Sequence, residues 1–92
     1  MIDIKDNMIP KIADGIKVRK EDFGLLIVSK RTPILTMNED STLIWNCING
    51  QVSISQISKK INDELDGETE ENNKIVKLFM ENCYKLGLID FE

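Results

Sequence analysis

The sequence predicts an α+β domain in which a three-stranded antiparallel sheet is followed by a three-helix bundle of winged-helix type. The first half of the 92-residue chain holds short apolar runs with strand character, and the second half holds longer segments with helical periodicity. The connections between the strands are short, whereas parallel pairs need crossovers of a dozen or more residues, so the strands are antiparallel. A chain of this length forms one domain with one small core.

The first two strands are expected on either side of a tight turn. Residues 16–20 alternate apolar and charged side chains, which is typical of a half-buried strand. Residues 21–24 form a hairpin turn in which Gly24 is free to take a positive φ. Residues 25–28 are continuously apolar, which is typical of a central strand with both faces covered.

A proline marks the third strand as an edge strand. Pro33 opens this strand, which covers residues 34–37. Proline cannot donate to a strand ladder and is confined to strand starts and edges. The third strand is therefore expected to be open along one side.

The first of the three helices is expected to follow the sheet directly. Asp40 or Ser41 is expected to cap it, and Asn49-Gly50 is expected to end it. Trp45, the only Trp in the chain, is interpreted as the anchor that joins this helix to the sheet.

The second helix has a complete N-terminal signature. Ser53 and Gln56 form a capping box, and Gly67 is expected near the other end. Val52 and Ile57 stand at the positions of a hydrophobic staple. The apolar stripe of this helix consists of Ile54, Ile57, Ile61 and Leu65.

The third helix, from Thr69 to Gly87, has an unusually wide apolar arc. A helix on one core needs an apolar stripe only a little over ~100° wide. The surplus indicates a second contact: the sheet covers it, the domain dimerises, or a groove beside the third strand accepts a partner's side chains. The central face carries Val76, Phe79, Cys83 and Leu86, and the flanks carry Ile75 and Leu78 on one side and Met80 and Tyr84 on the other.

Residues 1–15 have weak patterning and are expected to form a loosely ordered N-terminal arm before a domain over 16–92. They lack the charge and apolar run of a signal peptide. No stretch of the chain approaches the length of a membrane span. We therefore expect a cytoplasmic protein that does not contact a membrane.

The residue types argue against an enzyme. The chain contains no His, so the commonest general base and metal ligand is absent. Cys47 and Cys83 lie in apolar helical patterns without CxxC spacing and are interpreted as reduced core side chains. Glu70 and Glu71 point apart on a helix, where they suit the helix dipole. We predict no catalytic residue, no metal and no other cofactor.

The charge distribution argues against nucleic-acid binding. The net charge is −4. Residues 1–46 carry seven basic and seven acidic side chains, whereas residues 47–92 carry five lysines and nine acids. A helix that reads a DNA groove should be clearly positive, and here the helical half is acidic. A winged-helix DNA-binding transcriptional regulator remains the alternative function.

The order of these features resembles the PqqD-like family, or RiPP recognition elements, which bind leader segments of ribosomally made, post-translationally modified peptides. The resemblance covers about residues 10–90. It is carried by VRKED, FGLLIV, ILTMNED, IWNCING, SISQI and the ending KIVKLFMENCYKLGLID. Met37 stands where the family usually has Leu.

The resemblance implies that a leader peptide adds as an extra strand along the third strand and packs against the third helix, which is β-augmentation. The protein would act without a cofactor as a peptide chaperone in natural product biosynthesis. Its partners would be the precursor peptide and a maturation enzyme, for which the resemblance favours a radical SAM protein. Whether the domain also forms a homodimer is left open by the sequence. Carried onto this chain, the peptide-binding residues are Ile34, Leu35, Thr36, Met37, Lys74, Ile75, Leu78, Glu81 and Lys85.

Overall fold

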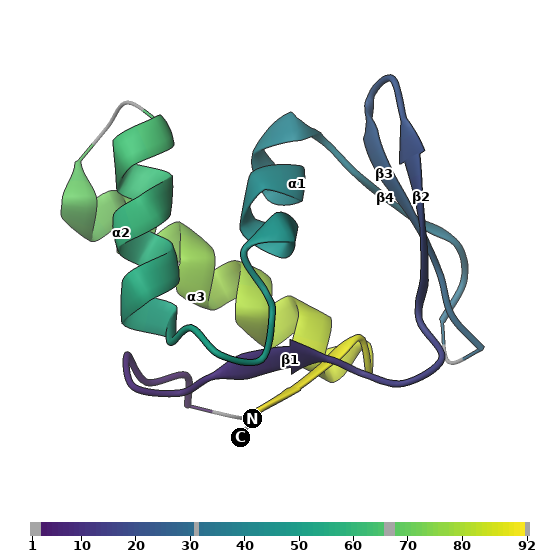
Figure 1. Ribbon diagram of the computed structural model, residues 1–92, viewed down its shortest axis with the longest axis horizontal. Coiled ribbons are helices and arrows are strands. Elements are labelled where there is room, and N and C mark those ends of the chain that lie inside the picture. Colours follow the sequence, from purple (N-terminus) through teal and green to yellow (C-terminus); the bar gives the residue numbers. More distant parts are fainter. Residues whose placement is uncertain (1–2, 31, 66–67, 92) are drawn as a thin grey trace.

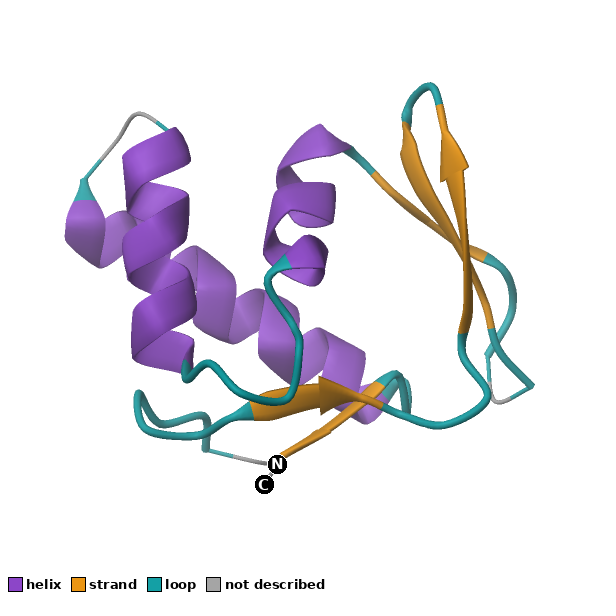
Figure 2. Cartoon of the chain, viewed as in Figure 1, coloured by secondary structure: helices purple, strands orange, loops and turns teal. Residues whose placement is uncertain are grey.

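The computed structural model describes residues 3–30, 32–65 and 68–91 and confirms the predicted α+β fold (Figures 1 and 2). In chain order the elements are β1 (Pro10–Ile12), β2 (Lys17–Glu21), β3 (Gly24–Val28), β4 (Leu35–Met37), α1 (Glu39–Asn46), α2 (Ile54–Glu64), α3 (Thr69–Lys85) and β5 (Ile89–Phe91). β2, β3 and β4 form the predicted antiparallel sheet with β3 in the centre, and β1 pairs with β5 in a second sheet that was not predicted.

A hairpin with a two-residue loop joins β2 to β3. The first residue after the loop, Gly24, has to be glycine. Glu21 pairs with Gly24 across the loop. Gly24 takes a φ of +142°, which confirms the positive φ expected there. A Cβ atom on this residue would collide with the backbone oxygen of Met37. The missing side chain therefore lets β3 approach β4.

The central strand is buried on one face only. Leu25 and Ile27 lie in the core, whereas Leu26 is half-buried and Val28 is 37% exposed. The prediction that both faces are covered is therefore wrong. The physical reason is that α1 packs against β3 and β4 from one side, and Figure 2 shows the helices on that side of the sheet.

The prediction of a half-buried first strand is confirmed only at Ile16, which is half-buried and packs against the core. Residues 17–20 are all exposed. Val18 lies opposite the buried Ile27, and therefore on the core-facing side, yet it is 45% exposed. The reason is that β2 is an edge strand and lies farther out than β3 and β4, against which α1 packs.

The third strand begins one residue later than predicted. β4 starts at Leu35, so Ile34 precedes the strand and is 64% exposed. β4 pairs with β3 only. The predicted edge position is therefore confirmed, and one side of β4 is unpaired within the described residues.

The cap of α1 differs from the prediction. The Asn38 side chain accepts a hydrogen bond from the Ser41 N–H at 2.9 Å, so Asn38 is the N-cap in place of Asp40 or Ser41. β4 ends at Met37, so the chain turns from strand to helix without a linker and the cap is the first residue after the strand.

α1 also ends earlier than predicted, at Asn46. Asn49 and Gly50 build the connection to α2 instead of closing the helix. The Asn49 side chain accepts hydrogen bonds from the N–H groups of the two residues after Gly50, at 2.9 and 3.1 Å. The Gly50 N–H donates to the carbonyl of Pro10 at 3.2 Å. This loop is therefore held by its own side chain and by β1.

The start of α2 matches the prediction. The Ser53 N–H donates to the Gln56 side chain at 2.8 Å, and the Gln56 N–H donates to the Ser53 hydroxyl at 3.3 Å, which is the expected capping box. The stripe of Ile54, Ile57 and Ile61 is buried, and Leu65 is half-buried. The helix end expected at Gly67 lies outside the described residues.

α3 begins and ends where the sequence indicates. After Lys85 the Gly87 N–H donates to the Tyr84 carbonyl, and the Leu88 N–H donates to the Cys83 carbonyl. This pair of bonds is the Schellman motif, with the glycine in the left-handed region. Leu88 and Ile89 then return to the core, where both are buried.

The expected loose arm is wrong for residues 3–15. Ile4, Pro10 and Ala13 are buried. The carbonyls of Asp6 and Met8 accept hydrogen bonds at 2.9 Å from the first turn of α2, and β1 pairs with β5. The partner of β1 lies at the far end of the chain, so local patterning in residues 1–15 carries no sign of the pairing.

One core cluster joins the sheet and the helices. Trp45 and Cys83 are each 3% exposed, which confirms their predicted core positions. Leu35 on β4 and Phe79 on α3 are half-buried and pack against the same cluster. The sheet and α3 therefore share one core.

We expect Gly24→Ala to lower the free energy of unfolding by about 1–3 kcal/mol, because the new Cβ meets the β4 backbone and the φ is strained. Gly15→Ala is the matched control: its φ is +80° and nothing lies within 4 Å of the added Cβ. Chemical denaturation of both variants measures the difference. Equal losses would show that the close approach of β3 and β4 is not what requires glycine.

Candidate functional site

The two edges of the three-stranded sheet differ in charge. β2 carries Lys17, Arg19 and Lys20, all exposed, and charged side chains on an edge strand discourage further pairing. β4 carries no charged residue along its length. The sheet therefore has one edge protected by charge and one edge open to another strand.

Thr36 is the residue of β4 whose backbone faces the open edge. Glu21 and Gly24 close the two-residue hairpin as a hydrogen-bonded pair, and such pairs alternate along an antiparallel ladder. The backbone groups of Leu35 and Met37 therefore point toward β3, and those of Thr36 point away from it. The Thr36 side chain is exposed as well.

The four predicted residues on this strand have different environments. Ile34 and Thr36 are exposed, whereas Leu35 is half-buried against the core. Met37 is 7% exposed and pairs with Leu25 in the core. Met37 was predicted to bind the peptide. Its side chain lies in the core and its backbone groups point toward β3, so Met37 does not face the open edge.

One flank of α3 is occupied by the rest of the chain. Asn73 donates a hydrogen bond to the Ser58 hydroxyl at 3.1 Å. The Lys77 ammonium lies 3.0 Å from a carboxylate oxygen of Asp6, and this hydrogen bond holds the Asp6 pKa below its usual value. The Tyr84 and Phe91 ring centroids are 5.6 Å apart. The rest of the chain therefore already contacts this flank.

The opposite flank of α3 is apolar and incompletely covered. Positions 75, 79, 82 and 86 are three or four residues apart and share one side of the helix. Ile75 is 48% exposed, Leu86 is 39% exposed, and Phe79 is half-buried. Phe79 and Leu86 were not among the predicted site residues, although both lie in the apolar arc. The sequence interpretation had placed them on one face with Val76 and Cys83. Those two residues are buried as expected, and Asn72 and Met80 complete the buried face.

The remaining predicted residues follow the outer face of α3. Positions 74, 78, 81 and 85 form one stripe along the helix. Leu78 is 59% exposed. The Lys85 ammonium is 3.3 Å from a Glu81 carboxylate oxygen, so these two side chains already form an ion pair with each other. Lys74 is exposed and has no ion pair among the described residues.

Neither cysteine has the environment of a nucleophile. Burial raises the pKa of Cys83 to about 12, and burial also raises the pKa of Cys47. The Cys47 thiol donates to the Leu43 carbonyl at 3.2 Å. Among residues 3–30, 32–65 and 68–91, no three Cys, Asp or Glu side chains come together as a metal site. No described helix is long and apolar enough to cross a membrane.

No protein-family model matches the sequence, and no curated protein matches it significantly. Solved structures do share its fold, each with a TM-score of 0.79. A lasso peptide synthetase B1 complexed with the leader peptide is 13% identical, over 88% of this chain and 96% of that chain. TbiB1 in complex with the TbiA(beta) leader peptide is 14% identical, over 87% of this chain and 94% of that chain.

A third solved structure comes from Methylobacterium extorquens. It is the PqqD truncation of PqqCD, which represents a functional and stand-alone RiPP recognition element. It is 9% identical, over 96% of this chain and 95% of that chain. At these identities the likeness shows the fold, so the PqqD-like fold implied by the sequence is confirmed.

We expect Cys83 not to react with a thiol-specific disulfide reagent in the folded protein at mildly alkaline pH, because the thiolate is the reactive form and burial suppresses it. Half-buried Cys47 should react more slowly than a free thiol. Both thiols should react in denaturant, which is the control. Rapid reaction of both thiols before unfolding would contradict the described burial.

Proposed function

We propose that this protein binds the leader segment of a ribosomally made precursor peptide as an additional strand on β4, with α3 as the second wall of the groove. This is β-augmentation, in which main-chain hydrogen bonds add to side-chain contacts in pockets. Two of the solved structures that share the fold are complexes with leader peptides.

The observation that carries the proposal is that large apolar side chains are exposed next to the uncharged edge of β4 and on α3. Ile34 and Leu78 are the most exposed large apolar side chains among the described residues, at 64% and 59%. They lie next to β4 and on α3, the two elements that would form the walls. A partner that covers both would remove this apolar area from water.

Apolar contacts should supply most of the affinity. Thr36 offers one N–H and one carbonyl to the open edge, and two such bonds contribute about 1 kcal/mol each. A dissociation constant of about 1 μM corresponds to a binding free energy of about 8 kcal/mol. The balance must come from burial of leader side chains against Ile34, Ile75 and Phe79, at about 1.5–3 kcal/mol per buried side chain.

Charge would have a small role in the proposed site. Lys85 is paired with Glu81, so a leader carboxylate would have to displace an existing partner. Lys74 is exposed without an ion pair among the described residues and is the better candidate for an acidic leader residue. An exposed pair of this kind contributes about 0–1 kcal/mol.

We further propose that the bound leader is delivered to a maturation enzyme in the cytoplasm. The partner that the sequence resemblance favours is a radical SAM protein. The binding domain would hold the leader while the enzyme performs the chemistry on the rest of the precursor. Catalysis would therefore belong to the partner.

The rival function, DNA binding through α3, is disfavoured by charge. α3 carries Lys74, Lys77 and Lys85, and two of them are paired with carboxylates, of Asp6 and Glu81. The same helix carries three acids, at positions 70, 71 and 81. Such a helix has no excess positive charge with which to neutralise phosphates.

We expect Thr36→Pro to weaken leader binding about tenfold or more, because it removes the N–H at the open edge and places a ring there. The β3–β4 ladder should survive, since proline is tolerated where the N–H faces outward on an edge strand. Calorimetric titration with the synthetic leader segment of a candidate precursor peptide gives the affinity.

Val18→Pro is the matched control, because the Val18 N–H faces outward on the opposite, charged edge of the sheet. It should leave leader affinity unchanged. If Val18→Pro abolished binding and Thr36→Pro did not, the peptide would have to add to β2. Absence of any binding to the wild-type chain would refute the proposed function.

We expect Leu78→Glu to weaken leader binding about 10–100-fold without loss of stability, because Leu78 is exposed in the free protein. Leu35 is a poorer test position, since it packs against the core. Ile12→Glu, at an exposed apolar position on β1, controls for the added charge and should bind normally. Equal effects at both positions would argue against α3 as a wall.

A further inference from the structure

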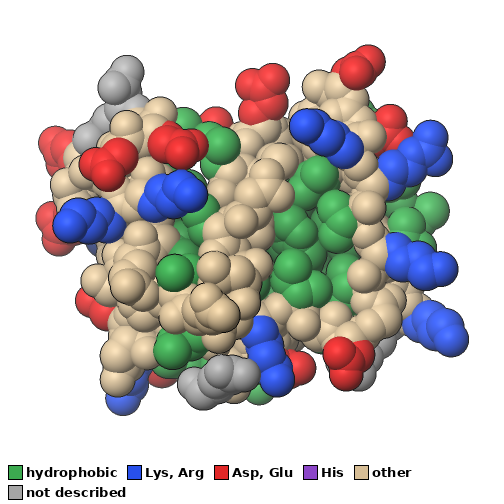
Figure 3. All heavy atoms as spheres, in the orientation of Figure 1, with side chains coloured by type: hydrophobic (Ala, Val, Ile, Leu, Met, Phe, Trp, Pro, Cys, Tyr) green, Lys and Arg blue, Asp and Glu red, His purple; other side chains and the backbone are tan. Residues whose placement is uncertain are grey.

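A second concave surface lies between the β2–β3 hairpin and α1. Its volume is about 630 Å³, which falls within the ~300–1,000 Å³ of typical ligand pockets. Figure 3 shows hydrophobic side chains gathered at the surface between α1 and the strands. The lining residues come from the hairpin, α1 and the end of α2, and none of them belongs to β4 or α3. A ligand in this cavity would leave the proposed peptide groove accessible.

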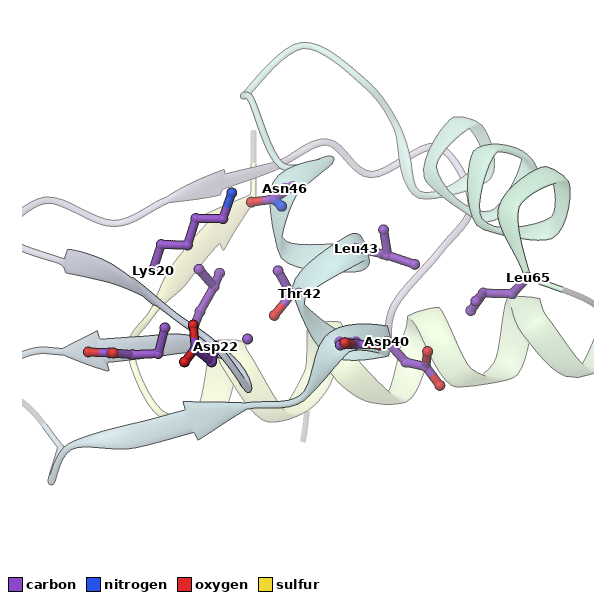
Figure 4. A pocket seen from close by; sticks show the side chains of 11 residues that line it. Lys20, Asp22, Asp40, Thr42, Leu43, Asn46 and Leu65 are labelled. Atoms are coloured by element: carbon purple, nitrogen blue, oxygen red, sulfur yellow. The ribbon is translucent and has the colours of Figure 1, made fainter.

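The lining of this cavity includes three leucine side chains. Leu25 from β3, Leu43 from α1 and Leu65 at the end of α2 contribute to it. In Figure 4 Leu43 lies on the side of α1 that faces Leu65. At the other end of the cavity, Lys20 from β2 and Asn46 from α1 point toward one another. The cavity thus curves around α1 and offers room for an aliphatic or aromatic side chain.

The rim of the cavity is acidic. Glu21, Asp22, Glu39 and Asp40 line it together with one cation, Lys20. Glu21 is 2.8 Å from the Arg19 guanidinium and is neutralised by it. The other three carboxylates have no ion pair among the described residues, so three acids face one lysine.

The helix dipole explains only part of this charge. Glu39 and Asp40 lie in the first turn of α1, where acids stabilise the helix. Asp22 lies in the hairpin and has no such role. A shallow hollow of about 330 Å³ continues past the same helix end and is lined by Phe23, Asn38, Glu39 and Asp40. The two carboxylates of α1 thus line both depressions.

The geometry points to a docking site for a protein segment that presents an apolar side chain next to Lys or Arg. The apolar side chain occupies the cavity among Leu25, Leu43 and Leu65, and the cation meets Asp22 and Asp40 at the rim. Charge complementarity selects this partner over an acidic one, and the net charge of −4 favours encounter with a basic surface.

A peptide-delivering domain needs a surface for the enzyme that does not overlap the surface for the peptide. This cavity provides one, so the basic segment would belong to the maturation enzyme. That identification of the partner rests on the proposed function. The docking chemistry of the cavity does not depend on it and can be tested separately.

The test uses the full isotope-labelled chain and two small peptides, N-acetyl-Leu-Arg-amide and N-acetyl-Leu-Glu-amide. The Leu-Arg peptide should shift the amide resonances of Gly24, Leu25 and Thr42, with a Kd of about 1–10 mM. The Leu-Glu peptide should bind about threefold more weakly or worse, since its charge opposes the rim. Equal shifts with both peptides, or no shift at these amides, would overturn the inference.

A charge-neutralising variant makes the test specific. Asp22→Asn with Asp40→Asn should remove the preference for the Leu-Arg peptide while the protein remains folded, because both side chains are exposed. Asp14→Asn with Asp90→Asn changes the net charge equally at exposed sites elsewhere and should keep the preference. Loss of preference in both variants would show a general charge effect and contradict a local site.

The two proposals can fail independently. Leader binding is measured in the same spectra from the Thr36 amide, which is not among the residues that line the cavity. A chain that binds leader but shows no preference for the Leu-Arg peptide refutes the docking site alone. A chain that prefers the Leu-Arg peptide but ignores leader refutes the proposed function alone.

Discussion

The pairing of β4 with β3 alone is the constraint on which the rest of this structure depends. Gly24 makes the close approach of the two strands possible, and Met37 is fixed in the core by the same pairing. The chain then turns directly into α1 through the Asn38 cap. One side of β4 therefore stays unpaired among the described residues, while its position relative to the helices is set by buried contacts on the other side.

Under the proposed function, this arrangement separates the residues that stabilise the fold from those that bind the peptide. The core is closed by residues far from the open edge, including β1, which pairs with β5 and also supports the start of α2. The exposed apolar residues Ile34, Ile75 and Leu78 contribute little to this core. Under the proposed function, binding energy would come from surface that the free fold does not need.

Local signals in the sequence predicted most elements, and long-range pairing explains what they missed. The capping box of α2, the glycine closure of α3 and the hairpin at Gly24 are each encoded within a few residues. The β1–β5 sheet depends on residues about eighty positions apart, and each strand is too short for a periodic pattern. On α3 the apolar arc was recognised, but the occupied flank follows from contacts with Ser58, Asp6 and Phe91 that no helical pattern reveals.

The most direct test of the central claim is hydrogen exchange of the Thr36 amide, measured by NMR with and without the leader peptide. We expect this amide to exchange quickly in the free protein and at least about tenfold more slowly in the complex, because a new main-chain hydrogen bond protects it. The amide of Val18 on the opposite edge should not change. If the Thr36 amide still exchanged quickly at saturating leader concentration, strand addition on β4 would be contradicted.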